Sequence, residues 1–228
     1  MEIAEVFYSI QGEGRFAGMP SVFIRTSGCN LRCVWCDTPY TSWAPQGKKW
    51  SLAQILREVG KFPSQHVVIT GGEPLLAADI VKLSDQLRAK GAHITIETAA
   101  TLFKPVHCNL ISMSPKLAHS TPWRRAKGKF AKMHETRRVN LEVIQQFIDR
   151  YNYQLKFVVD DRNDFTEIQA LLGRLANVER SRVLIMAQGK TSRELRNKTE
   201  WIIELCKDYG FRYAPRLHIE LFGNRRGT

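Results

Sequence analysis

Short runs of apolar and β-branched residues recur along the chain, and each has the length of a buried strand. They cover residues 21–25, 66–70, 93–98, 109–113, 155–160 and 182–186, with a weaker run at 212–220. Because these runs are apolar on both faces, they are typical of parallel strands that are covered on both sides.

Segments with apolar residues three and four positions apart lie between the runs and predict helices. These segments cover residues 51–62, 76–91, 140–151, 164–176 and 192–210. Alternating strands and helices predict an α/β fold whose parallel sheet is open or rolled into a full or partial barrel. No internal repeat, low-complexity tract or linker interrupts the pattern, so we expect one domain over residues 1–228.

Polar loops follow four of the predicted strands. The run at 21–25 leads into a segment with three cysteines, and the run at 66–70 leads into GGEP. The next two runs lead into TAAT and SPK. Because ligands bind at the carboxyl ends of parallel strands, we expect these four loops to meet at one rim of the sheet.

The composition is that of an ordinary globular domain, with 228 residues, 43% of them hydrophobic and 25% charged. The chain has no run of 18 apolar residues, and its beginning, MEIAEVFYSIQGEG, lacks the pattern of a signal peptide. We therefore expect a soluble, cytoplasmic protein without membrane contact. Five cysteines, an odd number, argue against a disulfide-bonded scaffold.

The formal net charge is +12, which would suit nucleic acid or a small anionic substrate as a partner. Much of the excess lies in residues 123–138 and in the tail GNRRGT, so the charge does not follow one helix or strand face. A solvated basic loop is the simplest interpretation. Residues 117–138 are called the basic segment below, and the sequence assigns no role to it.

Three cysteines lie within eight residues, at Cys29, Cys33 and Cys36. They can surround one soft metal centre if the segment is a loop, which Gly28 and Pro39 favour. A structural zinc site would need a fourth ligand, and none follows at a suitable spacing. A 4Fe–4S cluster held by three cysteines leaves one iron open to a substrate or cofactor. A zinc site or a structural cysteine loop remains the alternative.

The spacing Cys29-x3-Cys33-x2-Cys36, with GGEP after the next strand, resembles the radical S-adenosylmethionine (SAM) superfamily. This resemblance implies a partial, TIM-like βα barrel of about six parallel strands. The match is wider, because FYSIQGEGRFAGMPSVFIRTSGCNLRCVWCDTPY, VVITGGEP and SPK resemble the family of 7-carboxy-7-deazaguanine synthases over nearly the whole chain.

The resemblance implies an activity and its cofactors. The family converts 6-carboxy-5,6,7,8-tetrahydropterin to 7-carboxy-7-deazaguanine, by radical ring contraction with loss of ammonia, in 7-deazapurine (queuosine-type) biosynthesis. The implied cofactors are a 4Fe–4S cluster, SAM and magnesium, and reductive cleavage of SAM would give a 5′-deoxyadenosyl radical. A homodimer and a reducing partner such as flavodoxin or ferredoxin are also implied, whereas nucleic acid is not expected.

Site residues follow from the same resemblance. Cys29, Cys33 and Cys36 would hold the cluster, and Thr38 would bind magnesium. The residues implied for SAM are Trp35, Cys36, Asp37, Gly72, Glu73, Ser114, Pro115 and Lys116. The residues implied for the pterin are Ile10, Gln11, Gly12, Glu13, Arg25, Thr70, His218 and Thr228.

Several of these positions also have a plain structural interpretation. Thr38 could cap the turn before a proline, Arg25 could form a structural salt bridge, Lys116 could be a surface charge, and His218 could be a structural histidine. A glycyl-radical-enzyme activase is one alternative, because it shares the cysteine spacing and GGEP. It does not explain QGEG and Arg25, which favour the pterin as substrate. A metal-stabilised nucleic-acid-binding module would explain the charge but not GGEP at a strand end.

The chain departs from the family pattern at two places. Many relatives read ETNGT where this chain has ETAAT, so Ala99 and Ala100 weaken the case for Glu97 as a site residue. A frequent Gln-Pro after a late strand is replaced by Met186 and Ala187, which puts the corresponding adenosine contact in question.

Overall fold

The computed structural model describes all 228 residues. Its strands are β1 (Glu2–Ile10), β2 (Pro20–Thr26), β3 (Lys48–Lys49), β4 (His66–Gly71), β5 (His93–Thr98), β6 (Leu110–Met113), β7 (Tyr153–Val159), β8 (Val183–Ala187) and β9 (Arg212–Ala214). Its α-helices are α1 (Pro39–Ser42), α2 (Leu52–Val59), α3 (Ile80–Ala89), α4 (Ala131–Arg137), α5 (Leu141–Arg150), α6 (Asp164–Leu172), α7 (Ser192–Tyr209) and α8 (Leu217–Phe222). Short 3₁₀ helices lie at Gly14–Phe16, Pro74–Leu76, Ala118–Ser120, Arg125–Gly128 and Arg180–Arg182.

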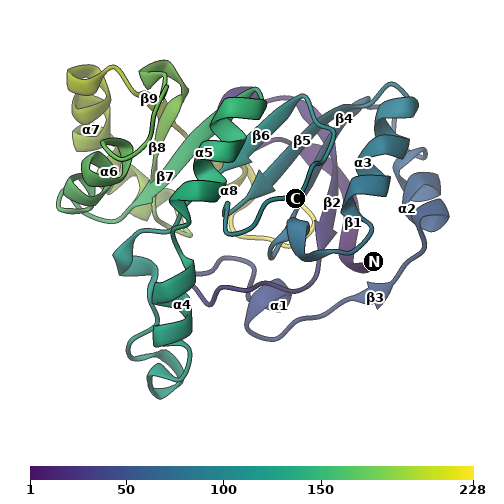
Figure 1. Cartoon of the computed structure of the whole chain (residues 1–228), viewed down its shortest axis with the longest axis horizontal. Coiled ribbons are helices and arrows are strands. Elements are labelled where there is room, and N and C mark those ends of the chain that lie inside the picture. Colours follow the sequence, from purple (N-terminus) through teal and green to yellow (C-terminus); the bar gives the residue numbers. More distant parts are fainter.

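All nine strands form one open sheet in the order β3-β1-β2-β4-β5-β6-β7-β8-β9 (Figure 1). Seven neighbouring strands, from β2 to β9, run parallel, and β1 pairs antiparallel with both β2 and β3. The predicted α/β class with an incomplete parallel barrel is confirmed. The expectation of about six parallel strands compares with seven in the structure, and β1 and β3 extend the sheet beyond β2 with antiparallel pairing.

Side chains alternate between the two faces of the parallel strands. One face packs against the helices through residues such as Ile24, Ile69, Ile96 and Phe157. The other face carries polar side chains towards the carboxyl ends, so the strands are not apolar on both faces. The polar residues on this face are Arg25, Thr70, Glu97, Ser112, Gln154 and Lys156, and several of them are buried.

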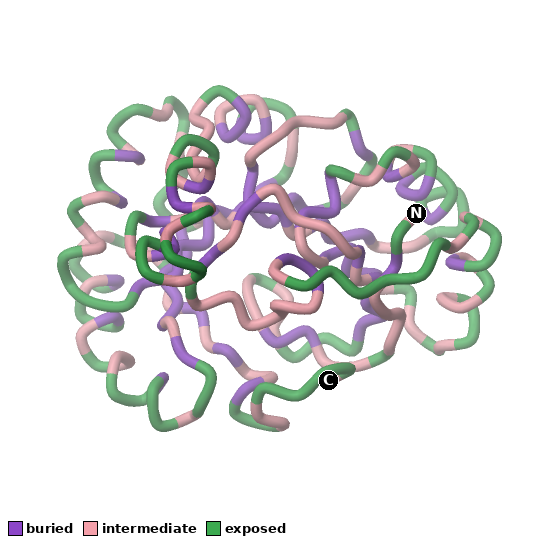
Figure 2. The backbone as a smooth tube through the Cα atoms, turned by 90° about the horizontal axis from the view of Figure 1, so that it is seen from below, coloured by how far each residue is buried: buried purple, intermediate pink, exposed green.

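The helices cover the outer side of the sheet, with their exposed faces on the periphery and the buried strand segments at the centre (Figure 2). Helices α2 and α7 each begin with a capping box, Ser51 with Gln54 and Thr191 with Glu194. Helix α7 ends at Gly210, whose φ of 68° suits a glycine. None of the helices combines the length and the apolar character that a membrane span requires.

One predicted element differs from the structure, and several observed elements were not predicted. The run at 212–220 is a strand only over Arg212–Ala214 and then becomes α8. Strand β1 was not predicted, and neither were the short helices α1 and α4. Each of these elements buries few side chains completely, so the apolar periodicity that marks a buried element is weak in them.

Candidate active site

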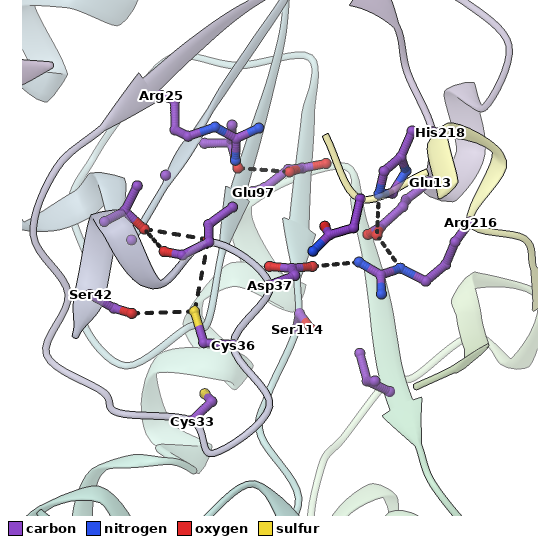
Figure 3. A pocket seen from close by; sticks show the side chains of 18 of the residues that line it. Glu13, Arg25, Cys33, Cys36, Asp37, Ser42, Glu97, Ser114, Arg216 and His218 are labelled. Carbon is purple, nitrogen blue, oxygen red and sulfur yellow. Dashed lines mark hydrogen bonds and ion pairs between the residues drawn. The ribbon is translucent and has the colours of Figure 1, made fainter. Parts of the chain in front are cut away.

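A cavity of about 500 Å³ lies at the carboxyl ends of the parallel strands (Figure 3). The loops after β2, β4, β5 and β6 all contribute to its wall, which confirms that these four loops meet at one rim. Residues of the loop after β1, of β7 and β8, and of the C-terminal segment complete the wall. This volume is within the range of about 300 to 1,000 Å³ that small-molecule sites have.

The cysteine segment runs as an irregular loop between β2 and α1. Its start is fixed by the backbone N–H of Gly28, which donates to the carbonyl of Thr41 at 2.9 Å. The indole N–H of Trp43 donates to the carbonyl of Cys33 at 2.9 Å. Gly28 has a φ of 102°, a conformation that favours glycine, so the turn out of β2 depends on this residue.

The three thiols of this loop are free and face the cavity together. Cys29, Cys33 and Cys36 pack in one small cluster with Leu31 and Ala99. Burial raises the pKa of Cys29 to about 11 and that of Cys33 to about 12. An uncompensated thiolate is therefore disfavoured here, and a cationic iron centre would reverse that preference.

The donor set fits a 4Fe–4S cluster better than a single ion. No three His, Cys, Asp or Glu side chains lie close enough to hold one metal ion. A cluster binds its thiolates at separate irons, so it does not need three sulfurs gathered around one point. The Cys36 sulfur also lies 3.2 Å from the Ser42 hydroxyl, and hydrogen bonds to sulfur adjust the potential of such clusters.

The GGEP loop packs directly against the start of the cysteine loop. A Cβ on Gly72 would lie 2.1 Å from the carbonyl oxygen of Gly28, so only glycine fits there. The backbone N–H of Glu73 donates to the same carbonyl at 2.9 Å. The Glu73 carboxylate points away from the cavity and is 1% exposed, because it accepts hydrogen bonds from Leu75, Thr98 and Ala99. Burial raises the pKa of Glu73 despite these hydrogen bonds.

A chain of ion pairs crosses the cavity from the loop after β1 to the cysteine loop (Figure 3). Glu13 pairs with Lys156 and, at 3.0 Å, with Nε of Arg216, and Arg216 also pairs with Asp37. Burial opposes ionisation of Glu13, but the charges of Lys156 and Arg216 outweigh it and hold the Glu13 pKa below its ordinary value. The same balance, with Arg216 as the cation, lowers the pKa of Asp37.

Arg25 lies at the end of β2, beside the same cavity. Its Nε donates to Glu5 at 2.7 Å, so the structural salt bridge that the sequence left open is present. Tyr40 donates to the same Glu5 oxygen at 2.8 Å. Since Nε faces the salt bridge, the two terminal nitrogens of Arg25 have no protein hydrogen-bond partner and remain available to a ligand in the cavity.

A second polar group, next to Arg25, joins β4, β5 and the loop after β1. The Glu97 carboxylate accepts from the Thr70 hydroxyl at 2.8 Å and from the Gln11 amide at 3.1 Å. Thr70 and Arg25 are register partners on β4 and β2. Despite the ETAAT departure, Glu97 faces the cavity, and Ala100 adopts a left-handed φ of 55°, a conformation that favours glycine.

The C-terminal segment closes one side of the cavity. The backbone N–H of Leu217 donates to the carbonyl of Gly12 at 2.9 Å, and a Cβ on Gly12 would lie 2.0 Å from Nδ1 of His218. Burial lowers the pKa of His218, although the Glu13 charge acts against that shift, so its ring is neutral at pH 7. Arg226 reaches back to the carbonyl of Ala4 at 3.0 Å, which brings Thr228 to the cavity wall.

Most of the sequence-predicted site residues line this cavity. Those that do are Ile10, Gln11, Gly12, Glu13, Arg25, Cys29, Cys33, Trp35, Cys36, Asp37, Thr38, Thr70, Gly72, Ser114, Lys116, His218 and Thr228. Glu73 and Pro115 do not, because both are buried behind the wall. Lys116 is not a free surface charge, since its amine donates to the carbonyl and the hydroxyl of Ser114 at 2.6 and 2.9 Å.

Sequence reasoning missed part of the cavity wall. Lys156 and Arg216 were not predicted, although a lysine inside the apolar run LKFVVD was a usable signal for the first. At the strand where Gln-Pro is replaced, Met186 and Gln188 line the cavity and Ala187 does not. The Gln188 carbonyl and side chain are both bound by Lys198, at 2.7 and 3.4 Å.

Comparison with known proteins gives a consistent result. Residues 23–151 match the family model described as the radical SAM superfamily. The chain is 45% identical over 227 residues to a 7-carboxy-7-deazaguanine synthase of Rhodopirellula baltica, covering 99% of this chain and 88% of the relative. It is 43% identical over 238 residues to one of Halobacterium salinarum, covering 100% and 93%. The crystal structure of QueE from Escherichia coli superposes with a TM-score of 0.70 at 27% identity, covering 95% of this chain and 94% of the other.

Proposed function

The chain belongs to the radical SAM superfamily and, within it, to the 7-carboxy-7-deazaguanine synthases, and we propose that the cavity described above is its active site. The protein is thus a radical SAM enzyme that converts 6-carboxy-5,6,7,8-tetrahydropterin to 7-carboxy-7-deazaguanine with loss of ammonia. One observation carries the placement of the site. Three free thiols of one loop face, across a single cavity, a buried network of charged side chains that come from distant parts of the chain.

Cys29, Cys33 and Cys36 hold the 4Fe–4S cluster in this proposal. When bound and reduced, the cluster supplies the electron that cleaves SAM. Their loop is fixed by Gly28 at one end and by Trp43 in the middle, so the three sulfurs are positioned before the cluster binds. Pre-organised ligands of this kind avoid an ordering cost on binding.

The SAM side of the cavity is formed by the loops next to the cysteines. Trp35 and Asp37 belong to the cysteine loop, Gly72 belongs to the loop after β4, and Ser114 and Lys116 follow β6. We assign these residues to SAM binding, and the missing Cβ of Gly72 lets its loop pack against the cysteine loop at this side of the cavity. Glu73 does not line the cavity. Its carboxylate accepts hydrogen bonds from Thr98 and Ala99 and so holds the loop after β4 against the end of β5.

Thr38 is our assignment for magnesium. Its hydroxyl lies at the cavity wall, 3.8 Å from the Cys36 sulfur and 3.4 Å from the Thr41 hydroxyl. Magnesium prefers oxygen ligands and often takes only one or two from the protein, with the remainder from substrate and water. Thr38→Ala should slow ring contraction and leave cluster content and SAM affinity unchanged, and Thr38→Ser should keep most of the activity.

The pterin side lies opposite, between the loop after β1 and the strands. Arg25 is suited to the substrate carboxylate, because its terminal nitrogens form a planar fork. Thr70, Gln11 and Glu13 offer polar groups to the bicyclic ring, and neutral His218 can donate or accept one hydrogen bond. The remaining residues assigned to this side are Ile10, Gly12 and Thr228.

Three further features belong to the proposal. A low-potential protein such as flavodoxin or ferredoxin delivers the electron, and two copies of the chain form a homodimer. We place the enzyme in the cytoplasm, because its three cluster cysteines have to stay reduced to bind iron. The relatives give no support to the activase or to the nucleic-acid-binding module.

An anaerobic reconstitution tests this function. The protein is loaded with iron and sulfide, reduced, and given SAM, magnesium and carboxytetrahydropterin, and the product is identified by mass spectrometry. We expect 7-carboxy-7-deazaguanine, and Cys33→Ala should lack both the cluster absorbance and SAM cleavage. A stoichiometric zinc atom without sulfide, or SAM cleavage without any pterin product, would overturn the assignment.

A further inference from the structure

The basic segment, residues 117–138, lies outside the cavity and carries a large charge. It contains seven Lys and Arg and one acidic residue. Its net charge of +6 is therefore half of the net charge of +12 of the whole chain. Only Arg138 has carboxylate partners, Glu135 and Glu167. The exposed cations without a carboxylate partner are Arg124, Lys127, Lys129, Lys132 and Arg137.

This segment is attached to the cysteine loop by two hydrogen bonds to the backbone of Val34. The N–H of Val34, between Cys33 and Trp35, donates to the carbonyl of Ser120 at 2.8 Å. The carbonyl of Val34 accepts from the Arg125 guanidinium at 2.9 Å. Both polar groups of the Val34 residue are therefore held by the basic segment.

Aromatic contacts make a second connection. The Arg125 guanidinium lies 3.9 Å from the centre of the Trp43 ring, and the Trp43 indole donates to the carbonyl of Cys33. Phe130 packs edge-on against Trp43 with ring centres 5.6 Å apart. The Trp43 side chain thus lies between Arg125 of the basic segment and the backbone of Cys33.

Exposed apolar side chains lie at the same place. Trp123 is 64% exposed and Val34 is 37% exposed. Helix α4 and the loop before it extend from the body of the molecule, away from α2 and α3 (Figure 1). An aromatic side chain surrounded by charged groups of one sign is typical of a protein interface with a partner of the opposite charge.

We propose that the basic segment, with Val34, is the docking surface for an acidic, flavodoxin-type protein that reduces the cluster. This inference rests on the proposed function, since it needs a cluster at the three cysteines. The partner's flavin hydroquinone loses one electron and becomes a semiquinone, and the cluster gains that electron. Opposite charges speed the encounter, and the attachment of the basic segment to Val34 places the partner next to the loop that carries the cluster cysteines.

The experiment compares two charge-reversal variants with wild type, using the holoenzyme. Arg124→Glu/Lys127→Glu changes exposed residues of the basic segment, and Arg57→Glu/Arg88→Glu changes exposed residues of α2 and α3 by the same charge. Cluster reduction is followed by loss of visible absorbance, first with a reduced acidic flavodoxin and then with reduced methyl viologen, a small cation that needs no docking surface. We expect the flavodoxin rate of Arg124→Glu/Lys127→Glu to fall by about tenfold at low salt, with little change in the control variant.

The remaining outcomes are also informative. Wild-type reduction by flavodoxin should slow as salt is added, whereas methyl viologen should reduce all three proteins alike. Equal rates in all three proteins with flavodoxin, or equal losses in both variants, would overturn the docking surface. So would salt-sensitive binding of RNA to the basic segment that leaves reduction by flavodoxin unchanged. Because the readout is cluster reduction, it remains valid if the pterin is not the substrate.

Discussion

The backbone N–H of Arg32, inside the cysteine loop, donates a hydrogen bond of 3.0 Å to Nδ1 of His134 on α4. Nε2 of the same ring lies 2.9 Å from the Ser120 hydroxyl, which itself donates to the carbonyl of Leu117. The ring therefore carries its proton on Nε2 and is neutral. His134 is completely buried, and burial lowers its pKa to about 4.

This relationship predicts a pH dependence of stability. A histidine that is neutral when folded and titrates near 6.5 when unfolded binds fewer protons in the native state between those pKa values. The contribution of His134 to the free energy of unfolding is complete above pH 6.5. As the pH falls towards 4, the free energy of unfolding decreases by about 3 kcal/mol on this account. Urea unfolding of the apo-protein at pH 7 and pH 4 should show this loss, and His134→Gln should show a smaller one. Identical losses in the two proteins would mean that other groups cause the effect.

Gly72 gives a prediction about the two loops that meet behind the cluster. In Gly72→Ala the new Cβ would lie 2.1 Å from the Gly28 carbonyl and 2.7 Å from that of Thr41, so the cysteine loop has to move. We expect a loss of stability of about 1 to 3 kcal/mol, as in overpacked cores, and poor cluster loading. Gly60→Ala is the control, because its nearest atom is the Leu56 carbonyl at 3.3 Å and its φ is −66°. Normal iron content in Gly72→Ala would show that the loop adapts.

Arg216 gives a prediction about the buried ion pairs. Arg216→Met leaves Asp37 without its cation and Glu13 with Lys156 alone. Removing one partner of a buried pair costs about 3 to 5 kcal/mol, because a charge remains uncompensated. Arg182→Met, which breaks the half-exposed pair with Glu179, should cost less than about 1 kcal/mol. Urea unfolding measures both, and equal costs would argue against a special role for the network.

The helices and parallel strands were predictable because each buries an apolar face with a regular period. Strand β1 was not, since it lies near the antiparallel edge and only Ile3 is fully buried in it. The segment LHIELF at α8 has the β-branched, apolar character of a strand, but it forms two turns of helix that bury only Ile219. Short elements of this kind are fixed by tertiary contacts and not by local preference.

The site was predictable where motifs lie close together in sequence, as for the cysteine loop and GGEP. The network of Glu13, Asp37, Lys156 and Arg216 joins residues up to 203 positions apart, and no spacing rule connects them. Arg216 in particular follows a three-residue strand, so nothing in its neighbourhood marks it as buried. Its position depends on how the C-terminal segment folds back over the loop after β1.

Arg25 gives a prediction about which side of the cavity binds the substrate carboxylate. Its Nε is held by Glu5, so the terminal nitrogens can bind a carboxylate in the cavity without giving up that salt bridge. A lysine at this position has one ammonium group and can serve Glu5 or the ligand, but not both in the planar geometry. The effect should appear in pterin binding and not in cluster content.

We expect Arg25→Lys to bind carboxytetrahydropterin more weakly by about 1.5 to 3 kcal/mol, the range for a hydrogen bond to a charged group. Turnover should fall while uncoupled SAM cleavage continues, because the substrate is no longer held at the reacting distance. Anaerobic calorimetry with SAM, magnesium and the pterin measures the change, and the SAM affinity serves as the internal control. Wild-type affinity in Arg25→Lys would remove Arg25 from the substrate site, and the Gln11 and Glu97 side of the cavity would then be the place to look for the carboxylate.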